Sequence, residues 1–467
     1  MFLNYNDIIN SFPVYKEEQL SSVINEQLQK LGKTIIVLDD DPTGTQTMHG
    51  VPILTVWDVH TIIQEIKRRT PLFYILTNSR SLPKTEADAL HRLISKNIRT
   101  AFEQNKKEFI LISRGDSTLR GHYPNDVYSI AEGLNCTQFV TAIIPAFFEG
   151  GRYTINDTHY LKEGHALVPV ASTPFANDNA FGFSNSDLKK WIEEKTEGTV
   201  KAVDVISFSI EELRINSADK IANKIKKLPS SAKCIVNAAA YCDLQKFASA
   251  YLNSGVTFIF RTASSFVKAI SGKEDKSLLQ KEDLINNRKH GGLIVVGSYV
   301  SKTTQQLNHL LSKNYITAYE IAIDHVLQGV IKPEDISTLI EKRIIEGESI
   351  VLYTSRKLHY VEDKEKSLVI GNQIADFITK VVSQIQVIPK FMIVKGGITS
   401  SDIAAKALQV KRAIVIGQAL PGIPVWKLEN ESKFPGMNYI IFPGNVGDDD
   451  TLTHLFKKLS TEKEESC

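Results

Sequence analysis

Two charged loops in the first half of the chain are the strongest candidates for chemistry, because each directly follows a short apolar run. The first holds Asp39, Asp40 and Asp41 and continues as Pro-Thr-Gly-Thr. Adjacent carboxylates repel one another, so such a run is expected where a cation, a positive side chain or a bound hydroxyl compensates them. One carboxylate could accept the proton of an attacking hydroxyl while another helps to hold Mg²⁺. The simpler interpretation is a helix cap with the remaining carboxylates in water.

The second loop reads Ser-Arg-Gly-Asp-Ser-Thr-Leu-Arg-Gly-His and also follows an apolar run. Arg114 and Arg120 carry planar guanidinium groups that match a carboxylate in bidentate fashion, while Asp116 and Ser117 can hydrogen-bond to hydroxyls. Arg80 follows a third apolar run. Any one of these arginines alone is more simply explained by a surface salt bridge. Their clustering at three predicted strand ends favours binding of a small hydroxy acid.

Three glycine loops in the second half have the character of phosphate sites. They are Gly297-Ser298, Gly396-Gly397-Ile398-Thr399 and Gly444-Asn445-Val446-Gly447. Glycine lets the backbone approach a ligand closely, and the free N–H groups at a helix start attract phosphate. Each loop taken alone is equally compatible with an ordinary tight turn, and none matches the Walker pattern GxxxxGK[ST].

The elements that position these loops are predicted from apolar runs that end in Gly, Asp or Ser and precede amphipathic stretches. Such runs lie at residues 34–41, 72–79, 108–116, 139–146, 233–240, 256–264, 292–298, 348–355, 391–397, 412–417 and 438–445. In an open parallel sheet, ligands bind at the carboxyl ends of the strands. We therefore predict an α/β protein of two domains, each a mainly parallel sheet flanked by helices.

The domain limits follow from changes in this pattern. Residues 1–33 have helical spacing that stops at a glycine and are expected to form a helical extension. Residues 34–275 form the first predicted domain and residues 290–467 the second, joined by a charged linker. Within the first domain, residues 157–183 are rich in Gly, Pro, Asn, Asp and Thr and are interpreted as long loops or an insertion.

Composition excludes several classes of protein. The 467 residues are 42% hydrophobic and 23% charged, which is typical of a globular protein. Lysine and arginine number 55 against 53 acidic residues, so the overall charge does not favour nucleic acid as a partner. Four cysteines without CxxC spacing, and the lack of an apolar run of membrane-spanning length, predict a cytoplasmic protein that does not act in a membrane.

Taken in order, the motifs resemble a known family. Asp40-Asp41-Pro42-Thr43-Gly44, then Arg80, then Arg114 to Gly121 are similar to the N-terminal domain of the four-carbon acid sugar kinase family. The glycine loops, together with Pro421-Gly422-Ile423-Pro424, resemble its nucleotide-binding domain. The resemblance runs from about Thr34 to Leu452.

The resemblance implies transfer of the γ-phosphoryl group of ATP to an acid such as threonate or erythronate, giving the 4-phosphate. It implies that Asp40 or Asp41 is catalytic, and that ATP and Mg²⁺ are required. The implied acid-sugar contacts are Arg80, Arg114, Gly115, Asp116, Ser117 and Arg120. The implied ATP contacts are Ser298, Gly396, Gly397, Ile398, Thr399 and Gly444. No protein ligand of a metal is assigned, and a homo-oligomer is left open.

The chain departs from the family pattern at three places. Pro42 stands where an aromatic residue is common, and Gln46-Thr47 stands where an acidic residue is common. Phe442-Pro443 replaces the Lys-Ser that often precedes the last glycine loop. The last departure removes a positive charge that would otherwise be assigned to phosphate binding.

Two other functions remain open from the sequence. A phosphatase of the haloacid dehalogenase type could use Asp39 and Asp41 in its DxDxT pattern, although its motifs would lie in one core and would not need the glycine loops. A non-catalytic sensor of sugar acids or nucleotides could keep the same fold without turnover.

Overall fold

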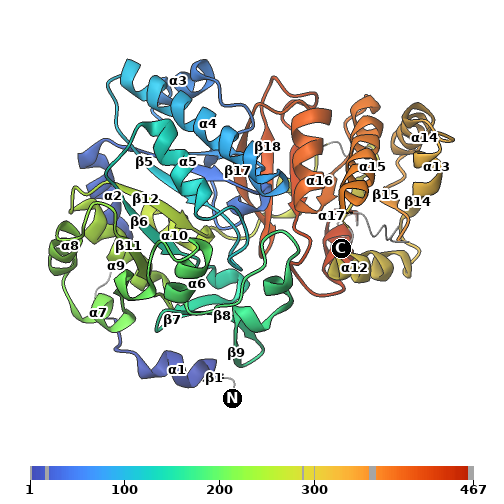
Figure 1. The fold of residues 1–467 in the computed structure, drawn as a ribbon. Coiled ribbons are helices and arrows are strands. Elements are labelled where there is room, and N and C mark those ends of the chain that lie inside the picture. The colour runs from blue at the N-terminus through green and yellow to red at the C-terminus, as the bar shows by residue number, and fades with distance from the viewer. Residues whose placement is uncertain (1–2, 16–19, 287–288, 299, 357–363, 461–467) are drawn as a thin grey trace, which may run out of the picture. The chain divides into compact units, whose positions relative to one another are not determined.

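The protein divides into two compact units in the computed structural model, which describes residues 3–15, 20–286, 289–298, 300–356 and 364–460 (Figure 1). Unit 1 comprises Met1–Thr47 and Val56–Asp275, and unit 2 comprises Met48–Thr55 and Lys276–Cys467. The chain therefore enters unit 2 briefly at residues 48–55, inside the predicted first domain. The second crossing, at 275/276, lies within the charged stretch where the sequence predicts a linker.

Unit 1 is built on a parallel sheet with strand order β10-β11-β6-β12-β5-β2-β4. Its strands are β2 (Thr34–Asp39), β4 (Leu72–Leu76), β5 (Phe109–Arg114), β6 (Val140–Ile144), β10 (Ile206–Phe208), β11 (Lys233–Val236) and β12 (Phe258–Thr262). Almost every residue of β2, β4, β5, β6 and β12 is buried, as expected for parallel strands covered on both faces.

Two separate groups of helices pack against this sheet (Figure 1). One group consists of α3 (Val59–Lys67), α4 (Lys84–Gln104) and α5 (Asn125–Leu134). The other consists of α2 (Leu20–Leu31), α7 (Ile210–Ile215), α8 (Ala218–Lys226), α9 (Tyr241–Leu252) and α10 (Ser264–Ser271). The predicted N-terminal extension is thus integrated into unit 1, because Asn25 of α2 donates to the Gly272 carbonyl at 3.1 Å and Gln27 donates to the Ser249 carbonyl at 3.3 Å.

A small antiparallel sheet, with order β1-β9-β8-β7, occupies part of residues 157–183, where the sequence predicts long loops or an insertion; the alternative of loops alone is wrong for 158–169. Its strands are β1 (Leu3–Asn4), β7 (Arg152–Ile155), β8 (Thr158–Glu163) and β9 (Ala166–Pro169). Its strands are short, with mixed polar and apolar residues, so they lack the apolar runs that mark buried parallel strands. Helix α1 (Tyr5–Ser11) packs on this sheet through a small apolar cluster, and α6 (Leu188–Lys195) follows it in the chain (Figure 1).

Unit 2 contains a mixed sheet with order β3-β17-β18-β19-β16-β13-β15-β14. Its strands are β3 (Val51–Leu54), β13 (Leu293–Val296), β14 (Thr317–Ile321), β15 (Ile350–Thr354), β16 (Met392–Lys395), β17 (Arg412–Leu420), β18 (Ile423–Leu428) and β19 (Asn438–Phe442). The five strands from β19 to β14 are parallel, and β3, β17 and β18 extend the sheet in antiparallel fashion. Residues 51–54 belong here because they pair with β17.

The helices of unit 2 surround one apolar core formed by strand and helix side chains. They are α11 (Lys281–Leu284), α12 (Ser301–Leu311), α13 (Ile323–Leu327), α14 (Pro333–Ile345), α15 (Lys364–Gln384), α16 (Gly397–Asp402), a π-helical turn (Ile403–Ala407) and α17 (Thr451–Ser460). Both units thus confirm the predicted α/β class. Within the described ranges of both units, no helix has the length and apolar character needed to cross a membrane.

Candidate functional site

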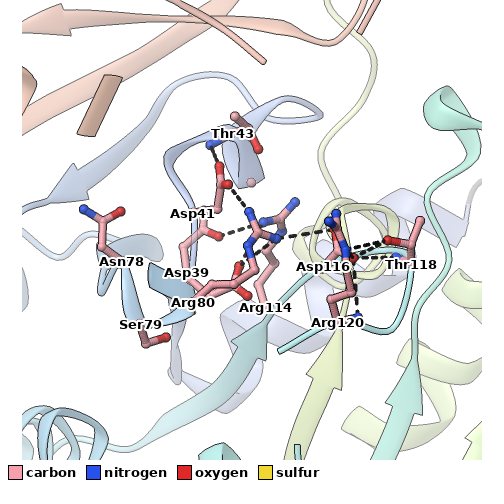
Figure 2. A network of polar contacts seen from close by, with 12 residues as sticks. Asp39, Asp41, Thr43, Asn78, Ser79, Arg80, Arg114, Asp116, Thr118 and Arg120 are labelled. Atoms are coloured by element: carbon pink, nitrogen blue, oxygen red, sulfur yellow. Dashed lines mark hydrogen bonds and ion pairs between the residues drawn. The ribbon is translucent and has the colours of Figure 1, made fainter. Parts of the chain in front are cut away.

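The charged loops of unit 1 meet because their strands are neighbours in the parallel sheet. Strand β2 lies between β4 and β5, and Asp39 is in register with Arg114 on one side and Leu76 on the other. The three strands therefore deliver the acidic loop, the Arg80 loop and the Arg114 loop to the same edge. Figure 2 shows the resulting network of carboxylates and guanidinium groups.

Asp39, the last residue of β2, is the fully buried member of this network. Its Oδ1 lies 3.2 Å from Nη1 of Arg114, and a Cβ at Gly44 would overlap its carboxyl group. Burial raises the pKa of Asp39 to about 8, although the Arg114 charge acts in the opposite direction. Glycine is required at position 44 because the turn packs directly on this buried carboxyl.

Asp41 is the cap of a short 3₁₀ helix, Pro42–Thr45, and accepts a hydrogen bond from the Thr43 N–H at 2.8 Å. It also forms an ion pair with Arg80. Burial alone would raise the pKa of Asp41, but the arginine charges and the Thr43 hydrogen bonds outweigh burial and hold it below its usual value. The simpler interpretation of the acidic run, a helix cap, therefore applies to Asp41.

Asp40 and Asp39 each have an Oδ2 atom that accepts no hydrogen bond from the described residues, but Asp40 keeps 11% of its side chain exposed whereas Asp39 has none. The Asp40 Oδ1 lies 3.4 Å from Arg114 Nη1 and 3.8 Å from Arg80 Nη1. Among the residues that the structure describes, none donates a hydrogen bond to the Asp40 Oδ2. Asp40 therefore keeps an acceptor available for a ligand hydroxyl, with two guanidinium groups fixing its orientation.

Asp116 occupies the other side of the network and binds two arginines. Arg120 contacts its two oxygens at 2.9 and 3.2 Å, and Arg80 lies 3.4 Å away. Burial would raise the pKa of Asp116, but the charges of Arg120 and Arg80 lower it well below its usual range. The three arginines expected to hold a substrate carboxylate thus face protein carboxylates in the structure, with Arg114 bound to Asp39 and Asp40.

Two further predicted residues shape the loop through their backbone. The Gly115 N–H donates to the Thr262 carbonyl at 2.9 Å, and a Cβ on Gly115 would overlap the guanidinium group of Arg261. The Ser117 carbonyl lies 2.8 Å from Nε2 of His159 on β8, a contact in which that nitrogen donates. Gly115 and Ser117 therefore define the path of the loop.

Arg261 and its partner were missed by the sequence reasoning. Arg261 is buried in β12, its Nε lies 2.7 Å from Asp126 Oδ2, and its Nη2 donates to the Arg120 carbonyl at 3.3 Å. The available signal was an arginine inside the apolar run VTFIFRTAS, because a charge in a buried strand requires a partner.

The glycine loops of unit 2 are also gathered by neighbouring parallel strands, β13, β16 and β19. A Cβ at Gly396 would lie 2.9 Å from the Ser298 Cβ, and one at Gly444 would lie 3.6 Å from the Ser298 Oγ. Thr399 belongs to the same cluster, since a Cβ at Gly297 would lie 2.6 Å from its Oγ1. The predicted ATP contacts thus come together.

The other two predicted ATP contacts lie at the start of α16. Gly397 is the first residue of that helix, and Ile398 is exposed. Because the helix is only six residues long, the cluster of loops is a better indication of a ligand site than its N-terminus.

Lys395 lies directly beneath these loops and is fully buried. Its Nζ donates to the Pro443 carbonyl at 3.0 Å and lies 3.8 Å from the centroid of the Phe442 ring. Phe442 is its partner in the β16–β19 register. Burial, helped by the positive charge of Lys302, lowers the pKa of Lys395 to about 7. Strand β16 therefore places the amine of Lys395 beside Phe442-Pro443, the two residues that stand where Lys-Ser is common in the family that the sequence resembles.

Replacing Lys395 with Met should change how stability depends on pH. The folded pKa, about 7, lies below the ordinary value of 10.5, so the folded state binds fewer protons between these pH values. Wild-type stability should therefore rise relative to Lys395→Met as pH increases from 7 toward 10, at about 1.4 kcal/mol per pH unit. Denaturant unfolding of both proteins at several pH values measures this difference. Lys427→Met removes an exposed lysine of β18 as a control, and a pH-independent difference for Lys395→Met would contradict the assignment.

The carboxylates of unit 1 do not form a metal cage. Asp41 and Asp116 face arginines, and in the described part of the chain no three His, Cys, Asp or Glu side chains are arranged to hold a metal ion. The side chains therefore do not fit a Mg²⁺ site built by the protein alone. A Mg²⁺ ion would have to rely on nucleotide phosphates and water.

Comparison with solved structures supports the fold. A Haemophilus influenzae protein of a family of unknown function aligns with a TM-score of 0.62 at 15% identity, covering 91% of this chain and 100% of its own. A proposed tRNA synthase from Salmonella typhimurium LT2 aligns with a TM-score of 0.65 at 15% identity, covering 91% and 98%. At this identity the likeness concerns the fold alone. Comparison with curated proteins finds no match.

Comparison with protein families identifies both halves of the chain. A family described as a sugar-binding N-terminal domain matches residues 35–270, and one described as a nucleotide-binding C-terminal domain matches residues 293–452. The first match includes the network of aspartates and arginines, and the second includes the three glycine loops. With both domains present in this order, the chain belongs to the four-carbon acid sugar kinase family.

Proposed function

We propose that the protein is an ATP-dependent kinase that phosphorylates a hydroxyl of a four-carbon acid sugar, such as threonate or erythronate, to give the 4-phosphate. The observation that carries this proposal is the position of Asp40. Its Oδ2 has no hydrogen-bond partner in the described residues, within a network of charged groups in the sugar-binding domain. A carboxylate held in this way can orient a hydroxyl and accept its proton.

The proposed step is a direct in-line transfer. The bond between the γ-phosphorus and the β–γ bridging oxygen breaks, a new bond forms from the substrate oxygen to phosphorus, and the hydroxyl proton passes to Asp40. Arg80 and Arg114 keep Asp40 oriented through its Oδ1. Asp41 maintains the turn and is not required to accept the proton.

The nucleotide is assigned to unit 2. Ser298, Gly396, Thr399 and Gly444 supply hydroxyls and closely approachable backbone at one edge of the sheet. The buried amine of Lys395 supports this assignment, since in the described residues it has no carboxylate partner and a phosphate nearby would favour its charged form.

Replacing Gly396 with Ala tests the nucleotide assignment. Gly396 has φ of +114°, and an added Cβ would lie 2.9 Å from the Ser298 Cβ. We expect the KM for ATP to rise about tenfold or more, because the new Cβ would press on Ser298 and displace the loops assigned to the nucleotide. The KM for the acid should change little.

Gly436→Ala is the matched control for this variant. Gly436 also has positive φ, +77°, but a Cβ there would meet no atom within 4 Å. Gly436 lies before β19, at the opposite end of that strand from the Gly444 loop. The control therefore introduces the same kind of backbone strain at positive φ, but away from the loops assigned to ATP. Equal effects of the two substitutions on ATP would count against the assignment.

The phosphatase alternative is less compatible with the structure. Asp39, its required nucleophile, has no exposed surface and packs against Gly44. Asp41 is engaged as a helix cap.

Incubation with ATP, Mg²⁺ and a panel of four-carbon acids tests the proposed function. ADP formation that depends on an acid supports the kinase. Phosphate release from phosphoesters would support the phosphatase, and binding of an acid without either reaction would identify a sensor. The position of the phosphate in the product, determined by NMR, tests the 4-phosphate assignment.

A further inference from the structure

Arg152 is an arginine of unit 1 that has no part in the proposed mechanism. It begins β7, directly after Gly150 and Gly151. A Cβ at Gly150 would overlap the Phe147 ring and would lie 2.8 Å from the Arg152 Nη1. The small residue at 150 thus makes room for the guanidinium group.

The contacts of Arg152 leave its charge uncompensated. Its Nη1 donates to the Gly150 carbonyl, and its Cζ lies 6.0 Å from the centroid of the Phe147 ring. Its Nε is buried and has no hydrogen-bond partner. Across the described residues, no carboxylate lies within ion-pair distance of Arg152.

The neighbouring arginines differ from Arg152 in this respect. Each of them has a guanidinium nitrogen within 3.5 Å of a carboxylate oxygen of at least one aspartate. The pairs are Arg80 with Asp41 and Asp116, Arg114 with Asp39 and Asp40, Arg120 with Asp116 and Asp178, and Arg261 with Asp126. A ligand carboxylate would have to compete with these protein carboxylates for Arg80, Arg114 or Arg120. Arg152 offers a guanidinium group without that competition.

The strand that carries Arg152 is linked to the charged network through β8. Strand β7 pairs with β8, and His159 of β8 contacts the Ser117 carbonyl of the Arg114 loop at 2.8 Å. Burial lowers the pKa of Arg152, the Asp116 charge partly opposes this, and the Arg120 charge adds to it. Asp116 and Arg120 both belong to the Arg114 loop.

An uncompensated guanidinium group with a buried, unbonded N–H is costly to fold around. A bound anionic ligand would pair with the guanidinium group and offset the free-energy cost of its burial. The planar fork of arginine matches a carboxylate in bidentate fashion. A dianionic phosphate fits less well, because Asp40 and Asp116 would repel two charges more strongly than one.

From this position we propose that Arg152 binds the carboxylate of the acid substrate. The proposal rests on the proposed function and makes it more specific, since Asp40 then faces the substrate's hydroxyl and Arg152 its acid group. Arg80, Arg114 and Arg120 orient the aspartates. Arg152 is thus the residue that distinguishes an acid sugar from the neutral polyol of the same length.

The test compares binding of threonate and erythronate with binding of the neutral threitol and erythritol, by calorimetry on the full chain. Arg152→Met should weaken acid binding at least tenfold and leave polyol binding unchanged. Arg152→Lys, which keeps the charge but loses the fork, should lie between wild type and Arg152→Met. Arg99→Met removes a surface arginine of α4 and serves as the control.

Kinetics and stability separate a binding role from a structural one. With Arg152→Met, the KM for the acid should rise at least tenfold, while the KM for ATP and kcat change less than about twofold. The melting temperature without ligand should stay within a few degrees of wild type, and the rise produced by the acid should disappear. If Arg152→Met does not fold, Arg152→Lys carries the same comparison.

The outcomes distinguish this proposal from the proposed function. Equal acid affinity in wild type and Arg152→Met, or a wild type that prefers the polyol or binds no acid, would overturn the assignment of Arg152. An acid that binds through Arg152 but is never phosphorylated would support the assignment and refute the kinase. Turnover of an acid with unchanged KM in Arg152→Met would support the kinase and refute the assignment.

Discussion

Replacing Asp40 with Asn is expected to reduce kcat by about 10²–10⁴-fold, the usual contribution of a positioned general base. The amide keeps the size of the side chain but cannot accept the hydroxyl proton. The amide oxygen can take the place of Oδ1 opposite Arg80 and Arg114 and keep the side chain oriented, although both contacts lose the carboxylate charge. Binding of ATP should be unchanged, and binding of the acid should change only a few fold, because the hydroxyl can still hydrogen-bond to the amide.

Asp41→Asn is the matched comparison, since it changes the next residue in the same network. Asp41 accepts from the Thr43 N–H and pairs with Arg80, so its loss should lower stability by about 1 kcal/mol, as for other helix caps. Its effect on kcat should be much smaller than that of Asp40→Asn. Rates with saturating ATP and acid, together with urea unfolding, measure both effects. Unchanged kcat in Asp40→Asn, or a larger loss in Asp41→Asn, would move the base elsewhere.

The parallel strands could be predicted from sequence because they are buried on both faces. Runs such as TIIVLD and FILISR are apolar throughout, which only a covered strand tolerates. The strands of the β7–β9 ribbon mix polar and apolar residues, so their sequence resembles loop. The place of Val51–Leu54 depends on pairing with β17, more than 350 residues away, and no local pattern carries that information.

The candidate site shows a similar division. The loops could be found because strand ends in a parallel sheet converge, which is a property of the fold. The pairing within the network could not be found, since three aspartates and several arginines allow many combinations that depend on side-chain geometry. Arg152 was missed because it lies in β7, whose mixed polar and apolar sequence is typical of a loop. Its distinguishing feature is the lack of a carboxylate partner in the described structure, which only the structure can show.

Replacing Gly115 with Ala should reduce kcat/KM for the acid about 10²-fold, the size of loss that follows a displacement of about 1 Å in a binding loop. Gly115 does not need positive φ, so the effect comes from contact alone. The new methyl group would overlap the Arg261 guanidinium group and force it away from Asp126. The same movement would break the hydrogen bond from Arg261 to the Arg120 carbonyl, and so displace the loop that orients Asp116.

Stability should fall together with activity in this variant, and the combination identifies the cause. Separating a buried ion pair typically costs about 3–5 kcal/mol, so Gly115→Ala should unfold at clearly lower urea concentration than wild type. Gly255→Ala is the control, because a Cβ there meets no atom within 4 Å and only the backbone at φ of +70° is strained. It should cost stability but leave kcat/KM for the acid unchanged. Full activity in Gly115→Ala would mean that Arg261 can move without disturbing the loop, and that the loop is held mainly by the Thr262 and His159 contacts.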